Sequence, residues 1–583
     1  MNKQDWDVLA ALHSKPYTTQ RALMQDTGYS LGGVNRSLQL LADEGYLDEK
    51  RHLTDKAETV IRERAPKRAV ILAAGFGMRM VPINMETPKA LVEVKGQRLI
   101  DRLICQLQEV GVTDITVVVG FMKEKFEYLI DTYGVALKVN PNYAAKNNLH
   151  SLALVKNKLS NAYIVPCDIW CRENPFSSQE LYSWYMVSDC EDPESVVRVN
   201  RKQELVAATE SAPGNRMVGI SYLQEQQGAR LAQTLAQMAG DEKYDDAFWE
   251  DALFGGKNVG VNARIVADEN AVEINTYEQL RELDSSSAQL NTDAILAVAE
   301  AMAVDPNEIT DITVLKKGMT NRSFLFTCKG KKYIMRIPGE GTDQLINRRE
   351  EAEVYQQLDG KRICDDIAYI NPENGYKITA YLEGARVCDP ENVEDLTRCM
   401  EKLRDFHNQG LQVGHTFDIF KQISFYESLW NGAPSVYEDY KKTKEQVFSL
   451  VPYIEKHKLP YVLTHIDAVP DNFLFVGDEI RLIDWEYAGM QDPHVDVAMF
   501  CIYSLYDREQ VERLIDLYFP EGCKKADRIK IYCYIAACGL LWSNWCEYKR
   551  QLGVEFGEYS LRQYRFAKDY YRIAIREMEA DHA

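Results

Sequence analysis

The chain has 583 residues, which is too long for one hydrophobic core and predicts about three to four domains. Apolar residues make up 46% and charged residues 27%, a balance typical of globular domains rather than of disordered chains. The net charge of −20 argues against a protein that coats nucleic acid or binds membranes through a polybasic surface.

Three further features predict a soluble, cytoplasmic protein. Residues 1–10 carry charges and no apolar run, so no signal peptide is predicted. The most apolar window, residues 531–542, is too short to span a bilayer. The 13 cysteines are scattered, odd in number and without a CxxC pair, which is typical of reduced thiols rather than of a disulfide framework.

Residues 1–66 are predicted to form short helices and a small wing. The segment Thr18-Thr19-Gln20 can cap one helix. Helical spacing is shown by the apolar residues Leu31, Val34, Leu38 and Leu41. This segment resembles a winged helix-turn-helix module. It holds nine Lys/Arg against ten Asp/Glu, and its candidate recognition helix has only Arg36, so we favour a protein-contact or regulatory role over DNA binding.

Residues 67–284 alternate apolar strands with helical patterns, which predicts a doubly wound α/β sheet. The first strand, residues 68–73, runs into a loop that contains Gly75 and Gly77. Glycines let backbone N–H groups approach phosphates, and Arg79 and Lys89 can balance the charge of a triphosphate. The spacing is neither that of the Rossmann motif nor that of the P-loop.

The pattern L-A-A-G-x-G-x-R with P-K-A-L downstream resembles nucleotidyltransferases that couple an NTP to a sugar phosphate or an alcohol phosphate. With residues 147–151, 166–168 and 248–251, it is similar to the bacterial CTP:phosphocholine cytidylyltransferases. The resemblance implies that Asp168 and Asp251 hold Mg²⁺, and that Asn148 and Trp249 contact substrate. It also implies that Lys89 stabilises charge as the phosphoamine oxygen attacks the α-phosphorus and pyrophosphate leaves.

Residues 285–583 follow a predicted linker at residues 284–287. Two strands, residues 323–328 and 332–337, precede a mostly helical remainder. This order predicts a small β-rich lobe followed by a larger helical lobe.

A phosphotransferase signature lies in the helical part. It has the form H-x-D-x-x-x-x-N from His465 to Asn472, and after an apolar strand it continues as I-D-W-E at residues 483–486. Asp467 can accept the proton of a substrate hydroxyl, while Asn472 and Asp484 offer oxygens to Mg²⁺. We expect His465 to orient the loop rather than to transfer protons.

These residues resemble choline and aminoglycoside kinases, which share a bilobal protein-kinase-like fold. The resemblance places Asn321 in the phosphate-covering loop, residues 318–323, and Arg336 on the strand that contacts ATP phosphates. It implies that Arg336 pairs with Glu351 on the following helix, with Glu350 and Glu353 as alternatives.

Recognition of a quaternary ammonium group depends on aromatic faces, because the group has no hydrogen-bond donor. Trp542 and Trp545 share one helical face, and Trp485 and Tyr487 flank the metal ligand. We therefore predict these four residues as substrate-binding, against the alternative that a helical aromatic stripe is ordinary core.

Together the two resemblances imply an enzyme of CDP-choline synthesis with ATP, CTP, choline and phosphocholine as substrates and Mg²⁺ as cofactor. One alternative is the same chemistry on ethanolamine or another aminoalcohol. A second alternative is a transcriptional regulator that senses choline metabolites through degenerate enzyme domains. We expect no membrane contact, and the oligomeric state is left open.

Overall fold

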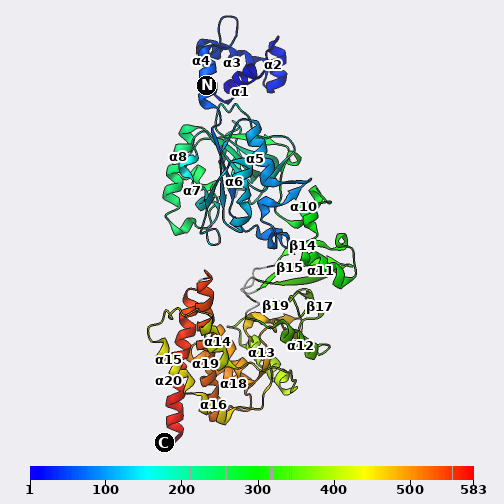
Figure 1. Cartoon of the computed structure of the whole chain (residues 1–583), viewed down its shortest axis with the longest axis vertical. Helices are drawn as coiled ribbons and strands as arrows, with labels where there is room; N and C mark the ends of the chain where they lie inside the picture. Colours follow the sequence, from blue (N-terminus) through cyan, green and yellow to red (C-terminus); the bar gives the residue numbers. More distant parts are fainter. Residues whose placement is uncertain are drawn as a thin grey trace. The chain divides into compact units, whose positions relative to one another are not determined.

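The computed structural model describes residues 1–209, 213–255, 259–315, 321–339, 342, 345–554 and 556–582 (Figure 1). The chain forms two compact units. The first contains Met1–Ile295 and Ile312–Val314, and the second contains Leu296–Asp311 and Leu315–Ala583. Within the described residues, no helix combines the length and the apolar character needed to cross a membrane.

The first unit begins with a helical module. Its four helices are α1 (Lys3–Ser14), α2 (Gln20–Thr27), α3 (Leu31–Asp43) and α4 (Asp55–Arg64). The side chain of Thr19 caps α2, as predicted. On α3 the exposed first residue is Leu31, and the buried apolar residues are Val34, Leu38 and Leu41. Among the described residues the wing is a single bridge between Leu47 and Leu53.

The helical module shares a hydrophobic cluster with the domain that follows it. Leu181 and Tyr182, which precede a strand of that domain, belong to the cluster of the module. The Arg64 guanidinium donates a hydrogen bond to the carbonyl oxygen of Leu181 (2.7 Å), and the Tyr182 hydroxyl donates to the Asp7 carboxylate (2.7 Å). The module is therefore packed onto the domain through both apolar and polar contacts.

A seven-stranded sheet forms the centre of that domain, with the strand order β12-β8-β11-β6-β1-β4-β5. Its strands are β1 (Arg68–Ala73), β4 (Asp114–Val119), β5 (Ala136–Val139), β6 (Ala162–Pro166), β8 (Trp184–Asp192), β11 (Gly214–Leu223) and β12 (Asn262–Val266). The strands β6, β1, β4 and β5 are parallel, whereas β11 is antiparallel to β6 and β8. The sheet is mixed, so the doubly wound arrangement holds for its parallel part.

Helices cover both faces of this sheet (Figure 1). They are α5 (Leu99–Glu109) and α6 (Tyr128–Tyr133) on one face, and α7 (Asn148–Ala153) and α8 (Glu225–Met238) on the other. Alternate residues of β1 point to opposite faces, as in any strand. Ile71 joins the cluster that contains Leu103 of α5, and Val70 joins the cluster that contains Leu149 of α7.

Shorter elements complete the first unit. They are the strand pairs β7 (Ile169–Cys171) with β13 (Ala271–Glu273), β2 (Glu93–Val94) with β3 (Gln97–Arg98) and β9 (Val197–Val199) with β10 (Leu205–Ala207), and the helices α9 (Asp251–Phe254) and α10 (Tyr277–Leu283). The predicted linker contacts the β2–β3 hairpin. The Lys95 N–H donates to the Asp284 carboxylate (2.6 Å), and the Ser287 hydroxyl donates to the carbonyl oxygen of Glu93 (3.0 Å). The chain passes between the units further on, over α11 (Asp293–Met302) and β14 (Thr310–Val314).

The second unit has the two predicted lobes. The small lobe is built on antiparallel strands in the order β15 (Asn321–Cys328), β16 (Lys331–Pro338), β18 (Lys377–Ala380) and β17 (Ile367–Ile370), with the helix α12 (Arg348–Leu358). The predicted strands, residues 323–328 and 332–337, lie within β15 and β16.

The large lobe is mainly helical. Its helices are α13 (Val393–Asn408), α14 (Ile419–Ser428), α15 (Tyr440–Phe448), α16 (Val451–His457), α17 (His494–Tyr503), α18 (Arg508–Tyr518), α19 (Lys525–Gln551) and α20 (Glu558–His582). Its short strands are β19 (Arg386–Val387), β20 (Val462–Thr464), β21 (Phe473–Val476), β22 (Glu479–Leu482) and β23 (Gly489–Gln491). The helix α19 is buried along most of its length, which explains why residues 531–542 form the most apolar window of the sequence.

Candidate active sites

A cavity of about 550 Å³ lies at the carboxyl ends of β1 and β6 in the first unit. Its lining includes the predicted residues Gly75, Gly77, Arg79, Lys89, Asn148, Asp168 and Trp249. Gly77 has a φ of +60°, and a Cβ atom at this position would lie 3.1 Å from the Cβ atom of Lys89. Glycine therefore lets the loop pass closely over the lysine.

Lys89 is at the charged centre of this cavity. Its ammonium group donates hydrogen bonds to the carboxylate of Asp168 and to the side-chain oxygen of Asn275. The other carboxylate oxygen of Asp168, Oδ1, is buried without a hydrogen-bond partner among the described residues. Glu273 lines the same cavity, and burial together with the charge of Asp168 raises the pKa of Glu273.

The structure places Asp251 apart from Asp168. Asp251 is the first residue of α9, and its carboxylate accepts a hydrogen bond from the Phe248 N–H (3.1 Å). It lines a separate depression that includes Ser195 and is not among the described residues that line the 550 Å³ cavity. Glu273 is one of the carboxylates that share the cavity with Asp168, and sequence reasoning missed it because it is remote in the chain.

Glu250 is a second residue that sequence reasoning missed, although its neighbours in the motif were selected. Its side chain lines the cavity and is buried, and burial raises the pKa of Glu250 to about 7. One carboxylate oxygen accepts a hydrogen bond from the Tyr185 hydroxyl (2.9 Å), and the other has no partner among the described residues. The Asn148 side chain accepts a hydrogen bond from the Trp249 N–H (2.8 Å), which fixes the start of this motif.

A second cavity, of about 600 Å³, lies in the second unit. Its lining includes the predicted residues Asn321, Arg336, Asp467, Asn472, Asp484, Tyr487, Trp542 and Trp545. The residues Gly318, Met319 and Thr320 of the predicted phosphate-covering loop lie outside the described residues.

The loop that carries Asp467 is held by Asp496 on α17. The Asp496 carboxylate accepts hydrogen bonds from the N–H groups of His465 (3.0 Å) and Ile466 (2.7 Å). The Asn472 amide donates to the backbone oxygen of Asp467 (2.9 Å) and to its carboxylate (3.3 Å). Burial, together with the charges of Asp484 and Glu486, raises the pKa of Asp467 to about 8. These contacts bring the predicted base and one predicted metal ligand side by side.

His465 lies behind the catalytic loop rather than in the cavity. Its Nε2 atom is 2.9 Å from the carbonyl oxygen of Ile483, and burial lowers the pKa of His465 to about 4. The ring is therefore neutral near pH 7 and links the loop to the strand that leads to Asp484.

Trp485 differs from the sequence prediction. Its side chain is fully buried, with ring centroids 5.1 Å from Phe406 and 4.3 Å from His465. It is not among the described residues that line the cavity, whereas Tyr487 is. Trp485 and Tyr487 are two residues apart, but their side chains point in different directions. Trp485 packs into the core of the lobe.

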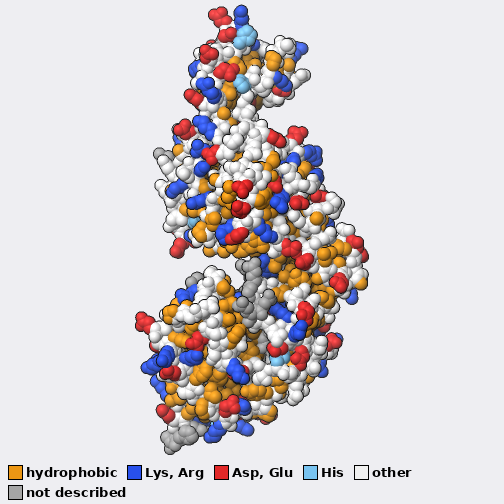
Figure 2. Space-filling view, in the orientation of Figure 1, with side chains coloured by type: hydrophobic (Ala, Val, Ile, Leu, Met, Phe, Trp, Pro, Cys, Tyr) orange, Lys and Arg blue, Asp and Glu red, His pale blue; other side chains and the backbone are white. Residues whose placement is uncertain are grey.

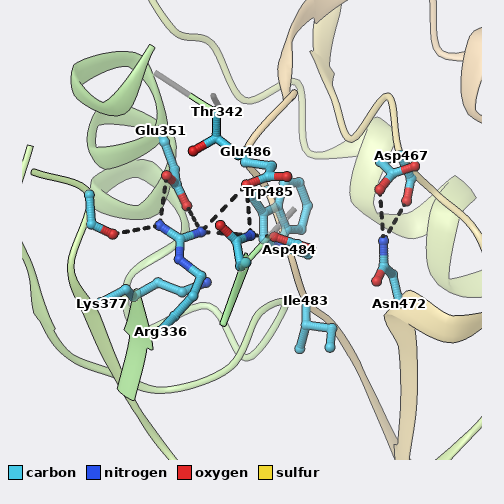
Figure 3. A network of polar contacts seen from close by, with 12 residues as sticks. Arg336, Thr342, Glu351, Lys377, Asp467, Asn472, Ile483, Asp484, Trp485 and Glu486 are labelled. Carbon is cyan, nitrogen blue, oxygen red and sulfur yellow. Dashed lines mark hydrogen bonds and ion pairs between the residues drawn. The ribbon is translucent and has the colours of Figure 1, made fainter. Parts of the chain in front are cut away.

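Arg336 pairs with Glu351, as the resemblance implies. The two guanidinium nitrogens of Arg336 lie 2.5 and 2.9 Å from the two carboxylate oxygens of Glu351, a bidentate geometry (Figure 3). Glu353 instead accepts a hydrogen bond from the Gly414 N–H (2.7 Å). The Asn321 amide donates to the Glu486 carboxylate (3.0 Å).

Lys377 is a third residue that sequence reasoning missed. It lies on β18 directly opposite Arg336 on β16, and its side chain is buried and lines the cavity. A lysine between apolar residues of a strand resembles an ordinary edge position in sequence, so only the pairing of β16 with β18 reveals its place.

Aromatic rings form one wall of the second cavity. The ring centroid of Trp542 lies 5.7 Å from that of Tyr487 and 5.4 Å from that of Trp545, with nearly perpendicular planes. Tyr503 and Tyr559 also line the cavity, with centroids 6.2 Å apart. The wall therefore contains two tyrosines that the sequence pattern did not single out.

Three families match successive parts of the chain. Residues 1–48 match the winged helix-turn-helix DNA-binding family, residues 69–244 the MobA-like NTP transferase domain, and residues 311–529 the phosphotransferase enzyme family. The order of the three families agrees with the order of the helical module and the two domains described above.

Individual relatives match the two enzyme domains separately. The chain is 31% identical over 221 residues to a choline-phosphate cytidylyltransferase of Streptococcus pneumoniae, covering 37% of this chain and 96% of that protein. It is 30% identical over 232 residues to a 2-aminoethylphosphonate cytidylyltransferase of Lancefieldella rimae, covering 37% and 88%. A crystal structure of the choline kinase LicA from Streptococcus pneumoniae shares 27% identity, covers 48% of this chain and 98% of its own, and has a TM-score of 0.42.

The cytidylyltransferase relative from Streptococcus pneumoniae is matched over 96% of its own length. The chain therefore belongs to the cytidylyltransferase family that includes choline-phosphate cytidylyltransferase, and it joins this MobA-like domain to a winged helix-turn-helix module and a choline kinase-like domain of the phosphotransferase enzyme family.

Proposed function

We propose that this chain phosphorylates choline with ATP and then transfers a cytidylyl group from CTP to the phosphocholine, giving CDP-choline and pyrophosphate. The observation that carries the proposal is the second cavity, in which the Asp467 carboxylate and an aromatic wall face one space. A hydroxyl to be phosphorylated and an ammonium group two carbons away are the two ends of choline. The printed name of the cytidylyltransferase relative supports the second step.

In the phosphotransferase site, Asp467 is the proposed base. Its raised pKa makes it a stronger proton acceptor than an ordinary carboxylate, and Asn472 orients it. Asp467 takes the proton from the choline hydroxyl as the hydroxyl oxygen attacks the γ-phosphorus and ADP leaves. Arg336, held by Glu351, lines the same cavity and is proposed to balance the charge of the phosphates.

The aromatic wall is the proposed ammonium site. The faces of Tyr487, Trp542 and Trp545 attract a positive charge, and each well-placed ring contributes roughly 0.5–2 kcal/mol. The same cavity is lined by several carboxylates, so its field also favours a cation.

In the cytidylyltransferase site, the glycine loop and Arg79 are proposed to bind the triphosphate of CTP. The oxygen of the phosphoamine attacks the α-phosphorus, and Lys89 stabilises the charge that develops as pyrophosphate leaves. Glu250 and Trp249 are proposed to face the ammonium end, because Glu250 has a buried carboxylate oxygen without a partner among the described residues.

Both cavities contain oxygen ligands that suit Mg²⁺. In the first, Asp168 and Glu273 are proposed to hold it, since Asp168 Oδ1 is buried and without a partner among the described residues. In the second, Asn472 and Asp484 are proposed to hold it, because both offer side-chain oxygens to the cavity. When bound, Mg²⁺ supplies positive charge to the phosphate groups.

A second candidate function is the same pair of steps on a primary amine such as ethanolamine. The Glu250 carboxylate oxygen that has no partner in the described part of the chain favours it, because a primary ammonium group can donate a hydrogen bond there and a quaternary one cannot. One cytidylyltransferase relative is named for 2-aminoethylphosphonate, a compound that carries a primary amine.

The regulator alternative is not favoured. Lys89 and Asp168 are both present in the first cavity, and Asp467 and Asp484 in the second, so neither domain lacks its proposed catalytic groups. On the face drawn in Figure 2, acidic and basic side chains of the N-terminal module are mixed rather than gathered into a basic patch. A DNA-binding surface is expected to be predominantly basic.

One coupled assay tests the proposal. The purified chain is incubated with ATP, CTP, Mg²⁺ and a panel of aminoalcohols, and the products are identified by mass. We expect phosphocholine with ATP alone and CDP-choline when CTP is added. CDP-ethanolamine in place of CDP-choline supports the second candidate, and the absence of both phosphorylated products contradicts the proposal.

A further inference from the structure

The buried lysine on β18 has no role in the proposed mechanism so far. Lys377 is 5% exposed and lines the phosphotransferase cavity. It is paired with Arg336 across β16 and β18, so the two side chains leave the same face of the sheet as close neighbours (Figure 3). The site therefore contains two adjacent cationic side chains.

The terminal nitrogens of Arg336 are already hydrogen-bonded within the protein. Both terminal nitrogens bond to the Glu351 carboxylate, and one of them also donates to the carbonyl oxygen of Gly375 (3.0 Å). Arg348 adds a further bond to Glu351 (3.1 Å). The glutamate and the two arginines form a group whose donors and acceptors are largely used within the protein.

Lys377 has a different environment. Its ammonium nitrogen lies 2.5 Å from the hydroxyl of Tyr355, a neutral group, and 4.5 Å from the centroid of the same ring. Among the described residues no carboxylate oxygen lies within 4.0 Å of this nitrogen. A buried ammonium group without a close counter-ion is strongly unfavourable unless nearby charges compensate for its lost hydration.

The compensating charge includes Asp484. Lys377, Arg336 and Asp484 line the same cavity, so the positive charges of Lys377 and Arg336 both act on the Asp484 carboxylate. In the described part of the chain, no hydrogen bond holds that carboxylate, and its nearest cationic nitrogen is that of Arg336 at 3.9 Å. Asp484 also has a φ of +67°, so its backbone adopts a conformation that L-residues rarely take. The positive charges of Lys377 and Arg336, rather than hydrogen bonds, can therefore orient the Asp484 side chain.

We propose that Lys377 is a positioning residue of the phosphotransferase site, whose ammonium group orients the Asp484 carboxylate toward a metal-bound nucleotide while Arg336 holds Glu351. The inference rests on the proposed phosphotransferase function. It assigns different tasks to the two cations: Arg336 joins α12 to the sheet, and Lys377 acts on the metal ligand.

The test measures ADP binding by calorimetry, with and without Mg²⁺, in the full chain. Lys377→Met keeps the length and volume of the side chain but removes its charge. Loss of a group that orients a metal ligand typically weakens metal-dependent binding about 10–100-fold, so we expect a loss of this size for ADP with Mg²⁺. Binding of ADP without Mg²⁺ should change by less than about threefold, because Lys377 acts through Asp484. Lys377→Arg should restore part of the loss.

Matched variants separate charge from packing. Lys332→Met removes a lysine of the same sheet that is exposed and paired with Glu383, and it should bind ADP like the wild type. Tyr355→Phe removes only the hydroxyl that contacts Lys377, and its effect should be smaller than that of Lys377→Met. A melting curve of each preparation checks that the second unit, which carries these substitutions, is folded, and cytidylyl transfer checks the first unit.

Three outcomes overturn the inference. Unchanged ADP binding in Lys377→Met shows that the positive charge of Lys377 does not contribute to nucleotide binding. An equal loss with and without Mg²⁺ places Lys377 on the phosphates or in the fold, rather than on Asp484. If the wild-type chain itself binds no ADP in the presence of Mg²⁺, the phosphotransferase assignment fails, and the inference fails with it.

Discussion

Asp168 and Glu273 face one cavity from the two strands of an antiparallel pair. Asp168 directly precedes β7, Glu273 ends β13, and the Ile274 N–H donates a hydrogen bond to the Asp168 carbonyl oxygen (2.9 Å). The pairing brings two carboxylates together beside Lys89, although they are far apart in the chain. Asp251, on α9, is outside this arrangement.

This arrangement predicts the effect of three matched substitutions on cytidylyl transfer. Asp168→Asn and Glu273→Gln each remove a charged oxygen from the proposed metal site and should lower the rate at least about 100-fold. Asp251→Asn should keep nearly the wild-type rate, because its side chain does not line the cavity. Pyrophosphate release from CTP and phosphocholine measures all three. A strong loss in Asp251→Asn, with normal Glu273→Gln, contradicts the assignment.

A second prediction concerns Asp467. Asp467→Asn should abolish ATP-dependent phosphorylation, because the amide cannot accept the hydroxyl proton. Cytidylyl transfer from added phosphocholine should be unchanged, since its cavity belongs to the other unit. Parallel loss of both activities in a folded variant argues against two separate active sites.

The same substitution predicts a pH-dependent gain in stability. The pKa of Asp467 is raised from 3.8 to about 8 in the folded chain, so the unfolded chain releases this proton at lower pH than the folded chain does. Between these two values, rising pH therefore destabilises the wild type relative to Asp467→Asn. The difference in melting temperature, variant minus wild type, should grow from about pH 5 to about pH 8. A constant difference would falsify the raised pKa.

A fourth prediction separates the aromatic wall from ordinary core. Trp542→Ala should raise KM for choline about 2–30-fold and leave KM for ATP nearly unchanged, because one cation–π contact is lost. Trp545→Ala should do the same and also lower the melting temperature, since Trp545 is 2% exposed within the core. Trp430→Ala is the control, because Trp430 is buried in the same lobe but is not among the described residues that line the cavity. Trp430→Ala should lower the melting temperature and leave KM for choline unchanged. An unchanged KM for choline in Trp542→Ala places the ammonium site elsewhere.

The last prediction concerns the N-terminal module. Deleting residues 1–62 exposes Leu181, which is 3% exposed beneath the module and is worth roughly 1.5–3 kcal/mol when buried. The deletion should lower the melting temperature of the first unit and leave ATP-dependent phosphorylation unchanged. Equal stability of the truncated and full-length chains shows that the shared cluster does not support the domain.

The sequence by itself indicated the three segments and the lobes of the second unit, and most of the site residues predicted from it line one of the two cavities. Local signals sufficed for these features. The glycine loop follows a strand directly, and the proposed base and metal ligands, from Asp467 to Asp484, lie within one short stretch, so spacing alone placed them together. The pairing of Arg336 with Glu351 also followed from adjacent elements.

Only the tertiary structure decided the partners that come from distant strands and the directions of neighbouring side chains. Glu273 joins Asp168 through the β7–β13 pairing, and Lys377 joins Arg336 through the β16–β18 pairing, neither of which leaves a local pattern. Trp485 and Tyr487 are both aromatic residues beside Asp484 in the sequence, yet Trp485 is buried in the core and Tyr487 lines the cavity. Strand pairing and side-chain direction are set by packing across the whole domain, so residue spacing does not contain them.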